Sequence, residues 1–418
     1  MSQILQGSSY ERAVATLESI YEHRKANPTS PTDLLYYRLI AGYNRRILRA
    51  REEGKKVIAQ TVYVPNELVY AFDLVPMVME NVSVTTSILL GAQEELLNTA
   101  KRFGLPPEVC SNHRVLTAFF LQDWSPAVDA VVWTHVLCDN TAKAGENIAQ
   151  LRRVPSYFLD RSYGAADRDA RYLAGELEGM VHFFQELTGR PLNWDRLEES
   201  LAHSQKMVEA QREMDRLREN IPSPMSNRKI YQLLFIHWLY SGSPEGSRFY
   251  QEALEEVKAG PSLPPERYRL LSLFVAPNYN WKILDWMERG YGARIVGDPY
   301  HCHWGEWEHD PSDPLLSLAR KLIATPACRQ LHGPIADFVA DAVEDATRFR
   351  THAAIYWAHI GCRQACGAIK VVKDALAGVG CPTLVLDLDI TDPTFVTTEA
   401  LKERLEGFFE VLKDTLTP

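Results

Sequence analysis

Hydrophobic residues in this chain occur in short continuous runs, and these runs alternate with segments in which hydrophobic residues recur every three or four positions. Continuous runs predict strands buried on both faces, as in a parallel sheet, and the spaced segments predict helices. The clearest example has a strand-like run at Ala353–Trp357, a break at Gly361, a helical segment ending near Gly378, and a second run at Pro382–Leu388. This order predicts a βαβ unit, which places loops at the carboxyl ends of parallel strands.

Similar runs predict further strands in both halves of the chain. They are expected at Val57–Val62, Val75–Met79, Ala127–Thr134, Ser156–Leu159, Leu270–Val275 and Ala293–Val296, with a helix at about Leu89–Phe103. The pattern divides the chain into a helical segment at 1–52, a first α/β domain at 53–165, a helical connection at 166–265 and a second α/β domain at 266–418. We therefore predict an α/β fold with two doubly wound parallel sheets facing a cleft.

Charge and composition narrow the classes of partner. The formal net charge is −9 and the isoelectric point is about 5.8, which argues against binding to nucleic acid or to an acidic membrane surface. No apolar run approaches the roughly 18 residues that span a bilayer, and the first residues lack a signal-peptide pattern. A cytoplasmic location is expected.

Seven cysteines, an odd number without a CxxC pair, make a disulfide framework unexpected. Cys110, Cys138 and Cys362 are each predicted at a strand end or a helix start, on the rim of the cleft. At a helix start the backbone amides and the helix dipole favour a thiolate. Three thiolates from separated loops fit a zinc site poorly, whereas a [4Fe-4S] cluster with one iron open to a ligand fits better. The alternative is three unrelated core or rim cysteines.

Five segments around these cysteines carry a family resemblance. They are YVPNELVYAFDLVP (Tyr63–Pro76), Cys110-Ser111, DAVVWTHVLCD (Asp129–Asp139), YWAHIGCRQACG (Tyr356–Gly367) and PTLVLDLDITDP (Pro382–Pro393). In this order they resemble the 2-hydroxyacyl-CoA dehydratase and benzoyl-CoA reductase family, over roughly residues 55–415. Each motif alone is weak, but the ordered set is specific.

The resemblance implies Rossmann-like domains, with Cys110, Cys138 and Cys362 holding a [4Fe-4S] cluster between them. It implies an acyl-CoA substrate, a homologous second subunit and an ATP-dependent iron-sulfur activator protein that donates low-potential electrons. In the dehydratases one electron enters the thioester carbonyl, which expels the 2-hydroxyl group and acidifies the β proton. In the reductases the electrons enter an aromatic acyl ring.

Two further cysteines depart from the simplest pattern, in which three cysteines hold one cluster. Cys366 lies one helical turn after Cys362, and Cys302 lies between His301 and His303 on the same predicted rim. Extra cysteines raise the alternative of a double-cubane cluster, which in one branch of the family serves a homodimeric reductase of small molecules. Packing of the Cys366 thiol inside a helix, and a polar loop around Cys302, are the simpler explanations. A non-catalytic electron-relay or scaffold subunit is a third possibility.

Three other residues are candidates for catalysis. His359 and Arg363 flank Cys362 and are expected to donate hydrogen bonds to cluster sulfurs or a substrate carbonyl, or else to cap the turn. Glu67 is a candidate for proton transfer, although an acidic residue also favours a helix start. The sequence has no Ser-His-Asp set, P-loop or G-x-G-x-x-G fingerprint, which disfavours ATP hydrolysis and nicotinamide binding by this chain.

Overall fold

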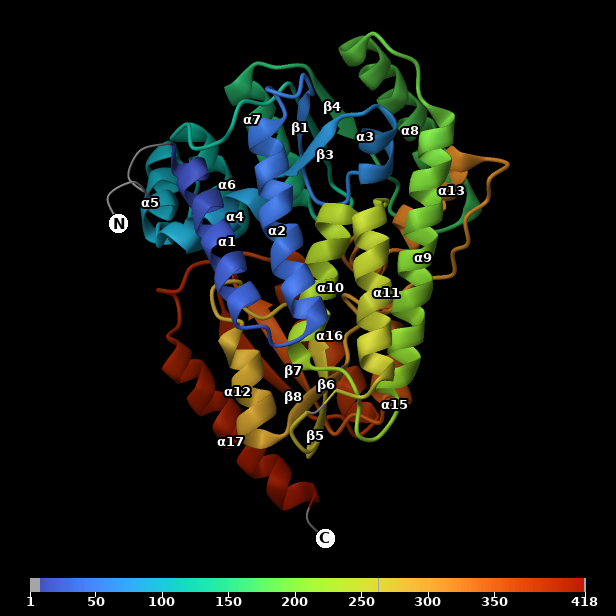
Figure 1. Cartoon of the computed structure of the whole chain (residues 1–418). Coiled ribbons are helices and arrows are strands. Elements are labelled where there is room, and N and C mark those ends of the chain that lie inside the picture. The colour runs from blue at the N-terminus through green and yellow to red at the C-terminus, as the bar shows by residue number, and fades with distance from the viewer. Residues whose placement is uncertain (1–7, 262, 417–418) are drawn as a thin grey trace.

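The computed structural model describes residues 8–261 and 263–416, and it contains two four-stranded parallel sheets among many helices (Figure 1). The first sheet has the strand order β2-β1-β3-β4 and consists of β1 (Val57–Gln60), β2 (Val75–Val78), β3 (Ala130–Thr134) and β4 (Ser156–Leu159). The second repeats this order as β6-β5-β7-β8 and consists of β5 (Tyr268–Leu273), β6 (Ala293–Gly297), β7 (Ala353–His359) and β8 (Thr383–Leu388). The prediction of two Rossmann-like parallel sheets is confirmed.

Each sheet is parallel throughout, so all its carboxyl ends meet at one edge. In β1, β5 and β7 every residue is buried, as the continuous hydrophobic runs predicted. The central pair of the first sheet aligns Ile58 with Ala130, and the central pair of the second aligns Leu271 with Ala354.

Helices pack around and between the sheets. The first half contains α1 (Ser9–Ala26), α2 (Pro31–Arg49), α3 (Asn66–Ala71), α4 (Met79–Leu90), α5 (Gln93–Phe103), α6 (Ser111–Leu121) and α7 (Asp139–Arg152). The second half contains α12 (Lys282–Tyr291), α13 (Pro314–Ala324), α14 (Pro326–Leu331), α15 (Ile335–Arg348), α16 (Arg363–Gly378) and α17 (Thr398–Leu416).

Four helices of the described residues lie between these halves in the sequence. They are α8 (Asp167–Thr188), α9 (Trp194–Arg218), α10 (Asn227–Tyr240) and α11 (Pro244–Lys258). Figure 1 shows α9 and α11 side by side along the molecule, and α10 contacts both β2 and α12. One continuous hydrophobic core includes residues of both sheets, such as Val131 and Leu271, so the halves pack as one unit.

The prediction of one helix starting at Leu89 was wrong. Residues Met79–Leu90 form α4, and α5 begins only at Gln93. Gly91 separates them in a left-handed conformation with φ 63°, which ends α4 at its carboxyl terminus. The short helix α14 was also not predicted.

No helix among the described residues combines the length and the apolar character that a bilayer crossing requires.

Candidate functional site

Three cysteines far apart in the sequence begin three helices at the facing edges of the two sheets. Cys110, Cys138 and Cys362 are the N-cap residues of α6, α7 and α16, so the predicted placement of Cys110 at a helix start is confirmed. Cys138 follows the carboxyl end of β3 in the first sheet, and Cys362 follows the carboxyl end of β7 in the second. The parallel topology therefore brings cysteines from both halves to one region.

These three cysteines line a single cavity of about 110 Å³, well above the roughly 10–15 Å³ that admits one water molecule. Its walls come from the loops after the strands of both sheets and from α4, α6 and α10. The apolar part includes Val62, Val84, Phe235, Trp238, Phe274 and Ile390. The polar part includes Glu80, Asn81, Asn112, His113, Asn278 and His359. An apolar cavity with a few converging polar groups is typical of a small-molecule or cofactor site.

The loop before Cys362 lies directly against the start of α6. A Cβ atom on Gly361 would lie 2.6 Å from Cα of Cys110, so only glycine allows this approach. Nδ2 of Asn140 donates to the Gly361 carbonyl at 3.4 Å, and Arg363 forms an ion pair with Asp139. Residues adjacent to the three cysteines therefore hold the cysteine-bearing loops together.

Hydrogen bonds also join α6 to the loop after β8. The Ser111 hydroxyl donates to Asp389, and the Thr391 hydroxyl donates to the side-chain oxygen of Asn112. Asn278 donates to the same Asn112 oxygen at 3.4 Å. Cys110 is therefore positioned by the second sheet as much as by the first.

Burial raises the pKa of the Cys362 thiol. The backbone amide of Ala365 donates to Sγ at 3.4 Å and opposes this rise, while the nearby Cys138 and Cys110 add to it. The thiol is consequently protonated at neutral pH in the free protein. A bound metal cation would have to replace this proton, as metal binding to cysteine generally does.

His113 in the cavity wall was not singled out in the sequence. Burial lowers its pKa, but hydrogen bonds to Cys110 and Glu80, together with the charge of Cys110 and Cys138, outweigh burial and raise the pKa well above the usual value. Its Nε2 lies 3.9 Å from Oε1 of Glu80 and 3.4 Å from the Thr141 hydroxyl. The available signal was its position three residues after Cys110, which places both on one face of α6.

Glu80 and Asn81 were missed because α4 was missed. Oε2 of Glu80 accepts from the backbone N–H of Val62 at 3.2 Å. Asn81 is 5% exposed, and neither atom of its side-chain amide makes a hydrogen bond to the described residues. Both lie in the first turn of α4 and line the cavity.

Of the three predicted catalytic residues, His359 lines the cavity and the other two do not. Burial lowers the pKa of His359 to about 4, and its Nε2–H donates to the Val275 carbonyl at 2.6 Å. The imidazole is therefore neutral, and its Nδ1 makes no hydrogen bond to the described residues. The Arg363 side chain is 73% exposed.

Glu67 lies in a buried ion pair with Lys321 of α13, away from the cavity. Burial raises its pKa, but the charge and hydrogen bond of Lys321, together with a hydrogen bond from Ser204, outweigh burial and lower the pKa to about 2. The Ser241 hydroxyl also donates to the carboxylate, at 3.0 Å. These three hydrogen bonds all go to Oε1, whereas Oε2 is buried and makes no hydrogen bond to the described residues.

The extra cysteines do not line the cavity. Cys366 is exposed on α16, and its thiol donates to the His359 carbonyl at 3.2 Å. Cys302 is buried and accepts from Nη1 of Arg218 at 2.8 Å. The remaining two cysteines, Cys328 and Cys381, are both buried.

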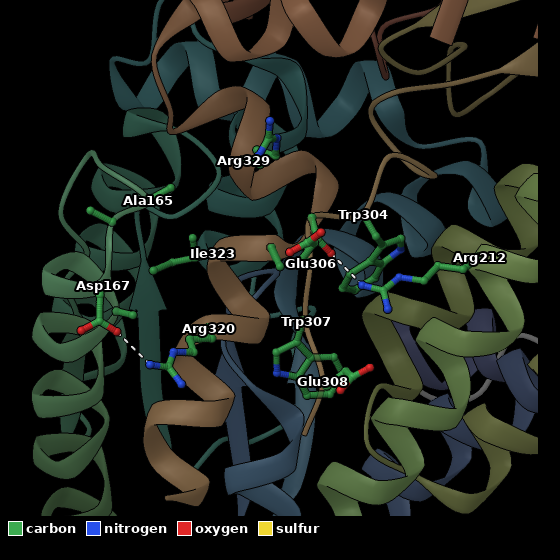
Figure 2. Close-up of a pocket in the computed structure, with 14 residues that line it drawn as sticks. Ala165, Asp167, Arg212, Trp304, Glu306, Trp307, Glu308, Arg320, Ile323 and Arg329 are labelled. Carbon is green, nitrogen blue, oxygen red and sulfur yellow. Dashed lines mark hydrogen bonds and ion pairs between the residues drawn. The ribbon is translucent and has the colours of Figure 1, made fainter. Parts of the chain in front are cut away.

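A larger open pocket of about 930 Å³ lies between α8, α9 and α13 (Figure 2). Its charged lining residues are balanced in sign, with Arg212, Arg320 and Arg329 against Asp167, Glu306 and Glu308. Figure 2 marks the ion pair between Arg320 and Asp167, whose atoms lie 2.8 Å apart. Arg212 donates to the Gly305 carbonyl at 2.8 Å. Charge balance gives this pocket no clear preference for an anion, so the cysteine cavity is the stronger candidate site.

Among the described residues, no three His, Cys, Asp or Glu side chains are grouped so that they could hold one metal ion. A polynuclear cluster does not need such a group, because each thiolate binds a different iron atom.

Comparison with known proteins gives one family and two relatives. Residues 61–412 match the family model described as 2-hydroxyglutaryl-CoA dehydratase, D-component. The chain is 23% identical to a benzoyl-CoA reductase subunit of Thauera aromatica, over 90% of this chain and 93% of the relative. It is 21% identical to the (R)-2-hydroxyisocaproyl-CoA dehydratase alpha subunit of Clostridioides difficile, over 90% of this chain and 95% of the relative.

Proposed function

The chain belongs to the 2-hydroxyglutaryl-CoA dehydratase D-component family, and we propose that it is an iron-sulfur subunit of an enzyme that acts on an acyl-CoA thioester. The reaction is either dehydration of a 2-hydroxyacyl-CoA or reduction of an aryl-CoA. The observation that carries this proposal is that Cys110, Cys138 and Cys362, from three helix starts, line one largely apolar cavity.

The residues around this cavity fit a cluster held by three thiolates. Several buried polar atoms beside the cysteines make no hydrogen bond to the described residues, among them Nδ1 of His113 and Nδ1 of His359. Such atoms are expected to have a partner in the working protein. When bound, a [4Fe-4S] cluster would supply a low-potential electron and an open iron that acts as a Lewis acid.

The protein's own residues supply positioning and exclusion of water. The apolar wall around Phe235 and Trp238 is suited to an acyl group and strengthens electrostatic interactions inside the cavity. His359 is fixed by its bond to Val275 and presents Nδ1 as an acceptor. We assign Glu67 to a structural ion pair and Arg363 to holding the α7 and α16 loops together.

The exposed Cys366 and the Arg218-bound Cys302 favour one cubane cluster over a double cubane. We further propose a homologous partner subunit, because both relatives are named as subunits. An ATP-dependent iron-sulfur activator protein is proposed as the electron donor, from the resemblance of the motifs.

Iron analysis of cysteine variants tests the cluster. Anaerobically reconstituted wild-type protein is expected to hold about four irons per chain. Cys110→Ser, Cys138→Ser and Cys362→Ser should each lose most of this iron and the cluster's electron paramagnetic resonance signal.

Cys366→Ser is the matched control, since it removes a thiol from the same helix as Cys362 but outside the cavity, and it should keep its iron. Equal iron loss in Cys366→Ser and Cys362→Ser, or about eight irons in the wild type, would point instead to the double-cubane alternative.

A further inference from the structure

Asn81 is an unusual asparagine for this protein. Four asparagines are buried among the described residues: Asn44, Asn66, Asn81 and Asn227. In the other three, both the oxygen and the nitrogen of the amide are hydrogen-bonded within the chain. In Asn81 neither atom is bonded.

A buried amide without partners is costly, and native proteins rarely leave one unexplained. Its neighbour Glu80 also lines the cavity, but the orphan oxygen of that carboxylate lies 3.9 Å from Nε2 of His113. Asn81 lines the same cavity, which is large enough for a ligand. The missing partner is therefore expected to be a bound molecule.

The amide defines what kind of group that molecule must present. Nδ2 is a donor only and Oδ1 is an acceptor only, so a complementary ligand carries an acceptor and a donor side by side. A 2-hydroxyacyl thioester has this arrangement, because its carbonyl oxygen accepts and the adjacent hydroxyl donates. An aryl thioester has the carbonyl oxygen but no neighbouring hydroxyl.

We propose that Asn81 binds the 2-hydroxy thioester group, with Nδ2 donating to the carbonyl oxygen and Oδ1 accepting from the hydroxyl. The residue thereby specifies a 2-hydroxyacyl-CoA over an acyl-CoA that lacks the hydroxyl. This inference rests on the proposed function and decides between its two reactions in favour of dehydration. The apolar wall formed by Val62, Val84 and Phe235 receives the rest of the acyl group.

Binding measurements on matched thioester pairs test this role. Calorimetry on the anaerobic, iron-loaded protein would compare lactyl-CoA with propionyl-CoA, 2-hydroxyisocaproyl-CoA with isocaproyl-CoA, and phenyllactyl-CoA with phenylpropionyl-CoA. A site that bonds a substrate hydroxyl discriminates strongly against an analogue without it. Wild-type protein should bind the hydroxylated member of at least one pair about tenfold or more tightly, and Asn81→Leu should bring that ratio close to one.

Asn278→Leu is the matched control, because Asn278 lines the same cavity but its amide nitrogen already donates to Asn112. It should change both dissociation constants of a pair by a similar factor and leave their ratio unaltered. Asn81→Ala serves as a second variant, and iron content and the thermal melting curve verify that each variant folds.

The outcomes separate this inference from the proposed function. A wild-type chain that binds no iron overturns the proposed function and this inference with it. An iron-loaded wild type that binds both members of every pair equally, or binds none of them, overturns the inference alone. An Asn81→Leu ratio equal to the wild-type ratio also overturns it, and indicates that water satisfies the amide.

Discussion

Glu67 and Lys321 form a buried ion pair that ties α3 to α13, and each residue is at most 3% exposed. Removing one partner of such a pair leaves an uncompensated buried charge. We expect Lys321→Met to lower the free energy of unfolding by about 3–5 kcal/mol, measured by urea denaturation. The double variant Glu67→Gln/Lys321→Met should recover much of this loss. A double variant no more stable than Lys321→Met would contradict the assignment.

The same pair gives stability a defined dependence on pH. The folded protein lowers the pKa of Glu67 to about 2, below the roughly 4.3 of an unfolded glutamate. Its contribution is therefore complete above pH about 4.3 and is lost as the pH falls toward 2. Glu67→Gln should flatten the stability profile across this window relative to wild type.

At the scale of single residues, the sequence identified the three cysteines but not all of their neighbours. Cys110, Cys138 and Cys362 stood out because each follows a recognisable strand or precedes a recognisable helix. His113 carried only the weaker signal of its spacing from Cys110. Asn81 carried no such signal, because an amide can be recognised as lacking hydrogen bonds only once the positions of all its neighbours are known.

At the scale of elements, the loop between β7 and α16 packs directly against the backbone at the start of α6. A methyl group at Gly361 would lie 2.6 Å from Cα and 2.8 Å from N of Cys110. Gly361→Ala should therefore destabilise the protein by about 1–3 kcal/mol in urea denaturation, because backbone must move to relieve the overlap. Its iron content should fall as the α6 and α16 starts separate.

Gly367→Ala is the control, on the exposed side of α16 where nothing lies within 4 Å of the added carbon. Alanine in a helix is favoured over glycine by about 0.5–1 kcal/mol, so this variant should be slightly more stable. If Gly361→Ala were as stable as Gly367→Ala, the close contact between the two loops would be refuted.

The error over α4 has a physical cause at the element scale. Its sequence, MENVSVTTSILL, is rich in β-branched residues that favour strands, and it directly follows β2. Most of its residues are buried against neighbouring helices, so it has no polar face and no helical periodicity for the sequence to display. Tertiary packing decides its structure, and the cavity wall it carries was missed with it.

At the scale of the whole molecule, the hydrophobic pattern predicted all eight strands that the described residues form, and it placed the ends of β4 correctly. Parallel pairing followed from the βαβ pattern. What the sequence does not contain is how the two sheets face each other, because that depends on α10 and the shared core rather than on any local signal. The family resemblance implied that the three cysteines converge, and the folded chain shows them lining one cavity. The cytoplasmic location and the absence of nucleic-acid binding stay predictions.

The central claim is that Cys110, Cys138 and Cys362 together hold one iron-sulfur cluster. Anomalous X-ray diffraction at the iron absorption edge, on crystals grown anaerobically from the reconstituted protein, tests it most directly. We predict a single iron cluster in the cavity, with iron atoms at about 2.3 Å from the Sγ atoms of all three cysteines, the usual length of a metal–thiolate bond. Crystals without iron, or iron bound through Cys366 or Cys302 while any of the three remains unbound, would contradict the account.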